Sequence, residues 1–304
     1  MGELAALVAA AVWAGASILW ARLGREATAR ALNFLKCALA ALALALTLWL
    51  LEGEAWPGGV QPTDMMWLSL SGLVGLTLGD TAYIHALQRI GARRTLLIWA
   101  LAPGVSALLA WPILNEPIHG AMLLGMTLTL GGVGWVVVER SPEAPLEKQR
   151  ATTGRSGLTR TERVGVFFAL LAVLGQAASN VLVKLGGVEV GALGASVVRL
   201  SVAAMGLGIY LGALGRLAEA MTPMRSKMSG ATVVLATLLG TYLGIWLSAY
   251  GVLHAEVGVA ASLNATSPLF VLPLAVWLEG ERLSARAILG ACVAVVGVAV
   301  FFVS

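Results

Sequence analysis

The sequence predicts an all-α integral membrane protein whose ten transmembrane helices form two inverted five-helix repeats. Of the 304 residues, 59% are hydrophobic and only 12% are charged, about half the charged fraction of an ordinary soluble domain. The hydrophobic residues form runs of about twenty, the length that spans a bilayer as a helix. In addition, the second half of the chain repeats residues of the first half at a constant offset.

The hydrophobic runs do not alternate with polar residues, so they favour helices over the strands of a barrel. The first run follows Met1-Gly2-Glu3, which lacks the basic segment of a cleavable signal. We expect ten spans, at residues 3–22, 30–51, 65–87, 94–112, 118–138, 163–184, 193–213, 230–252, 257–277 and 284–303.

A shift of 165 positions places the second half of the sequence on the first half without a gap. It pairs Gly75 with Gly240, Gly79 with Gly244, Pro103 with Pro268, and Glu116 with Glu281. A period this long indicates two copies of one unit of several helices rather than a short-repeat solenoid. We expect a first repeat at residues 1–139, a polar linker at 140–162 and a second repeat at 163–304.

The basic residues predict the orientation in the membrane. Of the 20 Lys and Arg residues, 17 fall in connections that lead from an odd-numbered span to the next even-numbered span. Positively charged connections stay in the cytoplasm, so both termini are expected outside. Because five spans per copy is an odd number, the second copy enters the membrane from the opposite side. This is the inverted-repeat arrangement of many secondary transporters.

The repeated glycines predict close helix contacts. Gly75 and Gly79 lie on one helix face, and so do Gly240 and Gly244. In lipid, helices associate through close packing, so such small faces mark contact sites. The same faces are also candidates for surfaces that slide during transport.

The repeated prolines and glutamates predict features at the ends of helices. Pro103 and Pro268 are expected to kink spans four and nine and to free a carbonyl that can face a cavity. Glu116 and Glu281 precede spans five and ten, where the helix dipole favours an acid.

Three charged residues fall inside predicted spans. Asp80 is a functional candidate because intramembrane carboxylates are costly; it either faces a water-filled cavity and couples protons, or is a hydrogen-bonded structural residue. Lys36 and Arg199 lie about two turns inside the second span of each copy. Each either snorkels or pairs with an acid, or contacts an anionic group of a substrate.

Polar and aromatic residues at helical spacing predict the lining of a central cavity. Such residues in a lipid-embedded helix face protein or water, and they can equally serve as contacts between helices. The candidates for substrate binding are Trp13, Ser17, Asp80, Trp99, Gln176, Asn180, Tyr242, Trp246 and Asn264.

The sequence contains no HExxH, GxSxG, Walker A or dinucleotide-binding motif. The two cysteines, Cys37 and Cys292, lie in separate spans and suggest packing residues rather than a disulfide framework or a metal site. We therefore expect no catalytic residue, no metal and no cofactor. The basic residues are explained by orientation, so nucleic acid is not an expected partner.

Two runs of residues carry a family resemblance. They are Ala86-Leu87-Gln88-Arg89-Ile90-Gly91-Ala92-Arg93-Arg94 with Leu101-Ala102-Pro103 and Leu114-Asn115-Glu116, and Ala255 with Ala260-Ala261-Ser262, Ser267-Pro268 and Leu278-Glu279-Gly280-Glu281. With ten spans and the doubled Pro-then-Glu spacing, nearly the whole chain resembles the drug/metabolite transporter superfamily, in its EamA-like ten-helix branch.

The resemblance implies a transporter of small molecules, such as amino acids, metabolites or drugs. It also implies a central cavity lined mainly by spans 1, 3, 4, 6, 8 and 9. Lys36 and Arg199 resemble the basic residue commonly found in the second helix of each family repeat. Many relatives carry basic residues between spans two and three and keep their termini in the cytoplasm. Here that connection has none, so the charges place the termini outside.

We therefore expect a multi-pass protein of the cell membrane, in bacteria the inner membrane, that acts as a secondary transporter or exporter without ATP. Alternating access would move the solute through the cavity between the repeats. The expected partners are a small-molecule substrate and membrane lipid, with the chain as a monomer or homodimer. The alternatives are a membrane enzyme acting on lipid-linked substrates and a scaffold without transport, and solute flux in liposomes would separate them.

Overall fold

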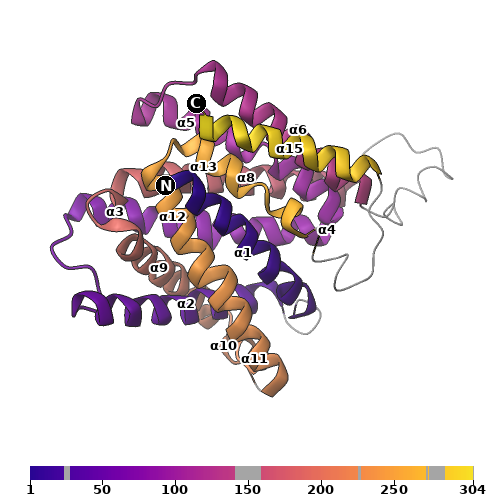
Figure 1. The fold of residues 1–304 in the computed structure, drawn as a ribbon. Coiled ribbons are helices and arrows are strands. Elements are labelled where there is room, and N and C mark those ends of the chain that lie inside the picture. Colours follow the sequence, from indigo (N-terminus) through magenta and orange to yellow (C-terminus); the bar gives the residue numbers. More distant parts are fainter. Residues whose placement is uncertain (24–27, 141–158, 225–226, 272, 274–284, 304) are drawn as a thin grey trace.

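A computed structural model describes residues 1–23, 28–140, 159–224, 227–271, 273 and 285–303. All regular secondary structure in this part of the chain is helical. The long helices run between two ends of the molecule, and both termini lie at the same end (Figure 1). Among the described residues, six helices are long and apolar enough to cross a membrane, and three shorter apolar helices accompany them.

The helices of the two halves follow the predicted spans closely. The first half contains α1 (Gly2–Leu23), α2 (Ala29–Glu52), α3 (Pro62–Ser71), η1 (Gly72–Gly79), α4 (Asp80–Trp99), α5 (Ala102–Leu114) and α6 (Gly120–Arg140). The second half contains α8 (Arg160–Gly187), α9 (Gly191–Ala213), α10 (Leu217–Ala220), η2 (Thr222–Met224), α11 (Lys227–Ala236), η3 (Thr237–Leu243), α12 (Gly244–His254), α13 (Val257–Asn264) and α15 (Ala285–Val303).

The start of α8 differs from the predicted end of the linker. The helix begins at Arg160, three residues before the expected start of the second repeat. Thr159 and Glu162 form a capping box, in which each side chain bonds the backbone of the other residue. This local motif extends the helix beyond its hydrophobic run. Residues 141–158, the rest of the expected linker, lie outside the described part of the chain.

The predicted connection at residues 88–93 is helical, because α4 continues through it. The chain nevertheless reverses there. The rings of Tyr83 and Trp99 lie 4.8 Å apart, whereas 16 residues of straight helix would separate them by about 24 Å. In the second half the equivalent turn is open, since α12 ends at His254 and Ala255 is extended.

The halves share their departures from regular helix at the offset of 165. Both η1 and η3 are π-helices, at residues 72–79 and 237–243. The helices also break after Trp99 and after Asn264. Pro103 lies in the first turn of α5, and Pro268 follows the second break directly. Each proline therefore stands just after a break that divides a span, rather than at a bend within a continuous helix.

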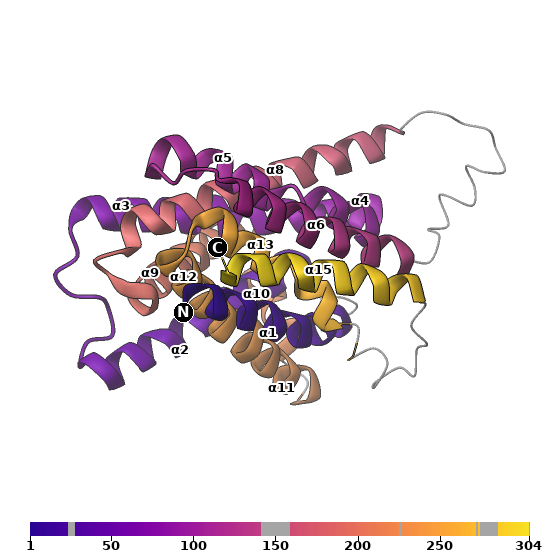
Figure 2. The same cartoon turned by 45° about the horizontal axis from the view of Figure 1, so that its top comes forward.

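The first helix of each half packs against helices of the other half. Helix α8 packs against α3, η1 and α4, and we call this group the η1 bundle. Helix α1 packs against α11, η3, α12 and α13, and we call this group the η3 bundle. Helices α6 and α15 pack on each other along their length, as Figures 1 and 2 show.

The predicted glycine contacts hold the exchanged helices in place. A Cβ at Gly240 would lie 2.6 Å from the Cβ of Ala16, and one at Gly244 would lie 2.6 Å from Cδ1 of Trp13. In the η1 bundle, a Cβ at Gly75 would overlap the Ser179 side chain. Each π-helical segment can therefore approach its partner helix only because glycine is present.

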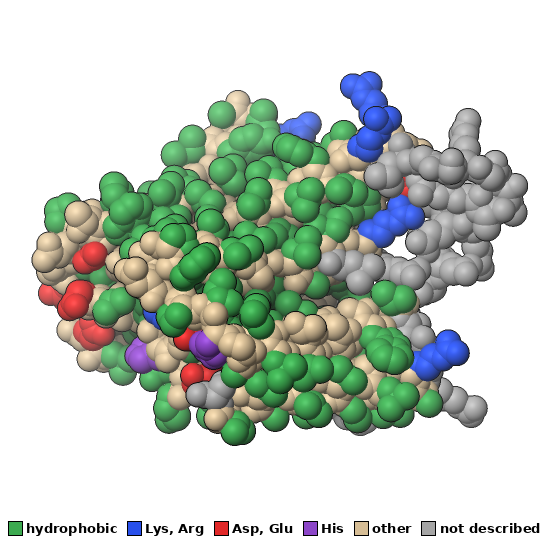
Figure 3. Space-filling model, turned by 90° about the horizontal axis from the view of Figure 1, so that it is seen from above, with side chains coloured by type: hydrophobic (Ala, Val, Ile, Leu, Met, Phe, Trp, Pro, Cys, Tyr) green, Lys and Arg blue, Asp and Glu red, His purple; other side chains and the backbone are tan. Residues whose placement is uncertain are grey.

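The charged side chains divide between the two ends of the molecule (Figure 3). Lys and Arg gather at the end where α6 ends and α8 begins, which we call the basic end. Asp and Glu gather at the opposite end, which we call the acidic end. The apolar side chains cover the surface between them. This is the surface pattern that a bilayer requires of a protein that spans it.

We expect Gly75→Ala to destabilise the protein, because the added Cβ overlaps Ser179 in a tightly packed interface. The cost of such overpacking is about 1–3 kcal/mol. Thermal unfolding in detergent measures it. The matched control is Gly131→Ala on α6, where a Cβ meets nothing within 4 Å. Equal melting temperatures for the two variants would contradict the proposed contact.

Candidate functional site

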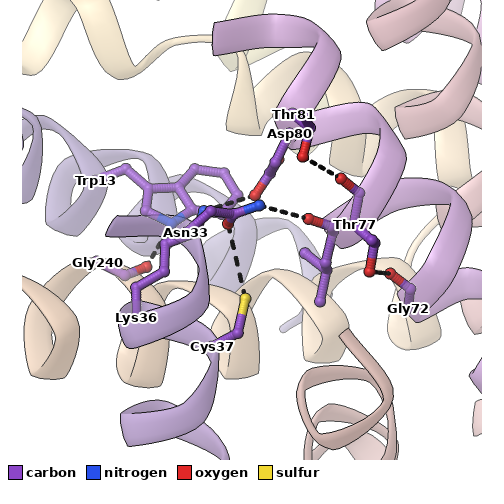
Figure 4. A network of polar contacts seen from close by, with 10 residues as sticks. Trp13, Asn33, Lys36, Cys37, Gly72, Thr77, Asp80, Thr81 and Gly240 are labelled. Carbon is purple, nitrogen blue, oxygen red and sulfur yellow. Dashed lines mark hydrogen bonds and ion pairs between the residues drawn. The ribbon is translucent and has the colours of Figure 1, made fainter. Parts of the chain in front are cut away.

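The central polar contacts connect α2 with the segment formed by η1 and α4 (Figure 4). The Nζ atom of Lys36 lies 2.6 Å from Oδ2 of Asp80. The two side chains are 23% and 21% exposed, so the pair is partly accessible at a depth of about two turns inside α2. Lys36 thus has a carboxylate partner within the protein. This geometry corresponds to the pairing alternative for Lys36.

The π-helix η1 supplies an acceptor to this region. Nδ2 of Asn33 donates to the carbonyl of Leu76 at 3.1 Å, and Sγ of Cys37 donates to Oδ1 of Asn33 at 3.7 Å. A π-helical segment leaves backbone groups without their usual partners, so a side chain can reach them. Asn33 was not among the sequence candidates, because a single amide in an apolar span gives no periodic signal.

Arg199 binds hydroxyl groups in the centre of the protein. Its side chain is buried, and it donates from Nε to Oγ of Ser71 at 3.0 Å and from Nη2 to Oγ of Ser179 at 3.2 Å. Ser71 and Ser179 also donate to each other's carbonyls. Among the described residues, no carboxylate forms an ion pair with Arg199. The guanidinium therefore connects α9, α3 and α8 through hydroxyl groups rather than through a salt bridge.

The amide candidates form two short chains of hydrogen bonds. Gln176 donates to Oδ1 of Asn180 at 2.9 Å, and Asn180 donates to Oγ of Ser106 at 3.4 Å. Asn264 donates to Oγ of Ser248 at 2.8 Å. Its Oδ1 is buried without a hydrogen-bond partner in the protein, which leaves an acceptor beside the helix break that follows α13.

The aromatic candidates hold neighbouring helices. Nε1 of Trp13 donates to the carbonyl of Gly240 at 2.7 Å, so α1 satisfies an acceptor of the π-helix η3. The hydroxyl of Tyr242 lies 2.9 Å from Oγ1 of Thr47, and its ring stands edge-on to Trp246 at 6.0 Å. Trp99 makes the ring contact with Tyr83 described above.

Ser17 is exposed and donates to the carbonyl of Ala14. The structure therefore distributes the predicted site residues over several small groups within and between the two bundles. Two of these groups are charged, the pair of Asp80 with Lys36 and the group around Arg199. Four hydroxyl partners were not predicted from the sequence, namely Thr47, Ser71, Ser106 and Ser248. Small hydroxyl residues hardly lower the hydropathy of a span, so no sequence signal marked them.

The structure also has a surface groove, and none of its lining residues belongs to these polar groups. It has a volume of about 540 Å³ and is lined by Leu269, Pro273, Ile288, Ala291, Cys292, Val295 and Val296. Its lining is apolar, and several of these side chains are exposed. We place the candidate site at the buried polar contacts instead, because a solute needs polar partners for its orientation. No group of three potential metal ligands occurs among the described residues.

The comparisons with known proteins identify the family. The EamA-like transporter family matches residues 1–138 and residues 163–303. The chain therefore belongs to the EamA-like transporter family, within the drug/metabolite transporter superfamily, and it is a multi-pass membrane protein.

Solved structures share the fold of this chain. One of them, described as "Crystal structure of protein", has a TM-score of 0.75 and 17% sequence identity, and the alignment covers 98% of this chain and 95% of the other. No curated protein matches the sequence.

We expect a double-mutant cycle to show strong coupling between Lys36 and Asp80. Either single change, Lys36→Gln or Asp80→Asn, leaves a partly buried charge without its partner, whereas the double variant removes both charges. The singles should each lower the melting temperature more than the double variant does, with a coupling of about 1–3 kcal/mol. If the effects of the two single changes on stability simply add in the double variant, the ion pair does not stabilise the protein.

Proposed function

We propose that this protein is a secondary transporter that moves small solutes through the space between its two bundles by alternating access. One observation carries the proposal. Both halves contain a π-helix and a proline-marked break at the same offset, and each half packs its first helix on the other half. Two equivalent bundles that share exchanged helices can take alternate roles at the two membrane faces.

The proposed architecture has ten spans in two inverted repeats, residues 1–139 and 163–304, with a linker at 140–162. The two family matches fall close to these limits. The separation of charges in Figure 3 supports an orientation with the basic end in the cytoplasm and both termini outside. Because one chain contains two equivalent halves, a monomer is sufficient for this mechanism. A homodimer is also compatible with it.

The proposed solute site contains the candidate residues that lie between and within the bundles. They are Trp13, Ser17, Asp80, Trp99, Gln176, Asn180, Tyr242, Trp246 and Asn264. Asp80 is the proposed proton-coupling group, because it is a partly accessible intramembrane carboxylate. Arg199 is a proposed contact for an anionic group, since it forms no salt bridge among the described residues. Lys36 is a second proposed contact, for which it would have to leave Asp80.

Small metabolites, amino acids or drugs are the proposed substrate class, and efflux across the cell membrane is the proposed direction; membership of a transporter family supports the movement of a small solute. A screen of such compounds by thermal stabilisation of the purified protein identifies ligands, because a ligand that binds the folded state raises its melting temperature. Flux of the stabilising compounds in proteoliposomes then tests transport. Binding without flux would instead favour a scaffold, and chemical conversion would favour an enzyme.

We expect Asp80→Asn to remove the pH dependence of flux in proteoliposomes, because the amide cannot exchange a proton. Flux driven by solute exchange at constant pH should continue in this variant. The matched control is Asp64→Asn, a carboxylate in the first turn of α3 that takes no part in the Lys36–Asp80 pair. A full pH response in Asp80→Asn would refute the coupling role while leaving transport itself intact.

A further inference from the structure

The two bundles pack tightly against each other at the acidic end. One apolar cluster there includes Val181 and Val183 of α8 together with Val252, Val257 and Leu263 of α12 and α13. It therefore joins the η1 bundle to the η3 bundle. A Cβ at Gly187 would lie 3.0 Å from Cδ2 of Leu253, which shows how closely α8 approaches α12.

At the basic end, the apolar clusters described in the structure stay on separate sides. One contains Leu23 with Val233 and Ala236, so α1 packs there on α11 and α2. The other contains Ile90 with Ala169, so the turn of α4 packs on α8. Among the described apolar clusters, one on the neighbouring pair α6 and α15 connects the sides, because Leu96 and Leu269 both contact it. The ion pair of Lys36 and Asp80 also joins α2 to α4. Among the described residues, no apolar cluster at the basic end joins α8 to α1 and α11 in the way that the cluster at the acidic end joins α8 to α12 and α13.

The exposure of side chains on one face of α1 also differs between the two ends. Ala10, Ala14 and Ser17 follow the helical spacing of one face. Ala10 and Ala14, nearer the acidic end, are 0% exposed, whereas Ser17, nearer the basic end, is exposed. Because the face is fully buried over its first part, it points into the protein. Ser17 is therefore accessible on a face of α1 that is buried nearer the acidic end.

Polar contacts fasten the acidic end across the two bundles. Nζ of Lys184 on α8 donates to the carbonyl of Ala255, which precedes α13, at 2.5 Å. The same Nζ lies 2.5 Å from Oε1 of Glu116, and Oε2 of Glu116 accepts from the backbone N–H of Val257 at 2.7 Å. Glu116 thus caps a helix of the other half rather than its own span, which corrects the expectation from the sequence. Glu281, its repeat equivalent, lies outside the described residues.

A second contact reinforces this arrangement. Nδ1 of His119 accepts from the backbone N–H of Met122 at 3.1 Å. The ring proton therefore resides on Nε2, which donates to Oε2 of Glu256 at 3.1 Å. His119 follows α5 in the first half, and Glu256 precedes α13 in the second. Residues 115–119 are consequently tied to the α12–α13 turn at two points.

We propose that Glu116, Lys184, His119 and Glu256 form a latch that closes the acidic end, and that this conformation of the protein is open at the basic end. This inference rests on the proposed transport function and names the closed gate and the conformational state. Opening the acidic end requires Lys184 to leave Ala255 and Glu116 to leave Val257. Loss of these charge-assisted hydrogen bonds should therefore shift the population toward the state open at the acidic end.

Side-specific labelling of a cysteine at Ser17 tests the latch without knowledge of the solute. The background carries Cys37→Ala and Cys292→Ala, because the parent has these two free cysteines. In vesicles of known sidedness, a membrane-impermeant maleimide should label Ser17→Cys faster from the basic side. Glu116→Gln or Lys184→Met should reduce the ratio of the two labelling rates about ten-fold, since each removes a charge-assisted hydrogen bond.

The matched control is Glu189→Gln, a carboxylate at the same end that takes no part in the latch contacts. It should leave the ratio of labelling rates unchanged. Faster labelling of Ser17→Cys from the acidic side would overturn the assigned state. An unchanged ratio in both Glu116→Gln and Lys184→Met, with normal melting temperatures, would overturn the latch.

Distances between pairs of spin labels give a second measurement, which does not depend on how well Ser17→Cys is labelled. One pair, Val188→Cys with His254→Cys, spans the bundles at the acidic end, and Arg160→Cys with Ala231→Cys spans them at the basic end. Glu116→Gln should lengthen the first distance and shorten the second. Unchanged distances in both pairs would refute the latch. If the distances change but no solute is transported, the latch holds and the transport proposal fails.

Discussion

The structure depends on the close approach of one helix to a π-helical segment at two equivalent places. In a bilayer, a backbone carbonyl that leaves the regular helix pattern needs a partner from the protein. Trp13 provides it for Gly240 in η3, and Asn33 provides it for Leu76 in η1. Glycines in η1 and η3 make the approach possible. In η3 the exchanged helix α1 supplies the partner of the carbonyl, whereas in η1 the partner comes from α2 and the exchanged helix α8 contributes close packing.

The close packing of helices also explains why charged side chains are tolerated in the centre of the protein. Lys36 and Asp80 neutralise each other, and Arg199 is surrounded by the hydroxyls and carbonyls of two serines. Ser71 and Ser179 can reach Arg199 because α3 and α8 lie in contact along the glycine-lined face. Burial of a charge in an apolar environment is costly unless such partners surround it. The glycine contacts thus also position the groups from which a solute site can be built.

Hydropathy and charge were sufficient to predict most helix limits, and the family was recognised from the doubled Pro-then-Glu spacing. The π-helices were not predicted, because Gly72 to Gly79 has the hydropathy of any apolar span. The turn within α4 was expected as a loop, yet helix-forming residues allow the backbone bonds to continue through it. Lys36 and Asp80 were each singled out, but their contact depends on how α2 packs against α4, which sequence spacing does not specify.

The prediction for Glu116 illustrates the same limit. The sequence placed an acid before a helix and assigned it to the dipole of that helix. In the structure the carboxylate binds the N-terminus of α13, 141 residues further along the chain. Local rules identified the right kind of partner but not which helix end supplies it. That choice follows from the tertiary arrangement of the two halves.

The exchange of first helices also constrains how the chain is made. Helix α1 ends at Leu23, and its partner helix α11 begins at Lys227, 204 residues later. At ordinary rates of synthesis, the ribosome needs about 10–40 seconds to cover that length. During this interval the indole of Trp13 has no carbonyl of η3 to bind, and the small face of α1 borders lipid. The first half of the chain is therefore inserted before its packing partners exist. Folding can be completed only after the last helices have been inserted.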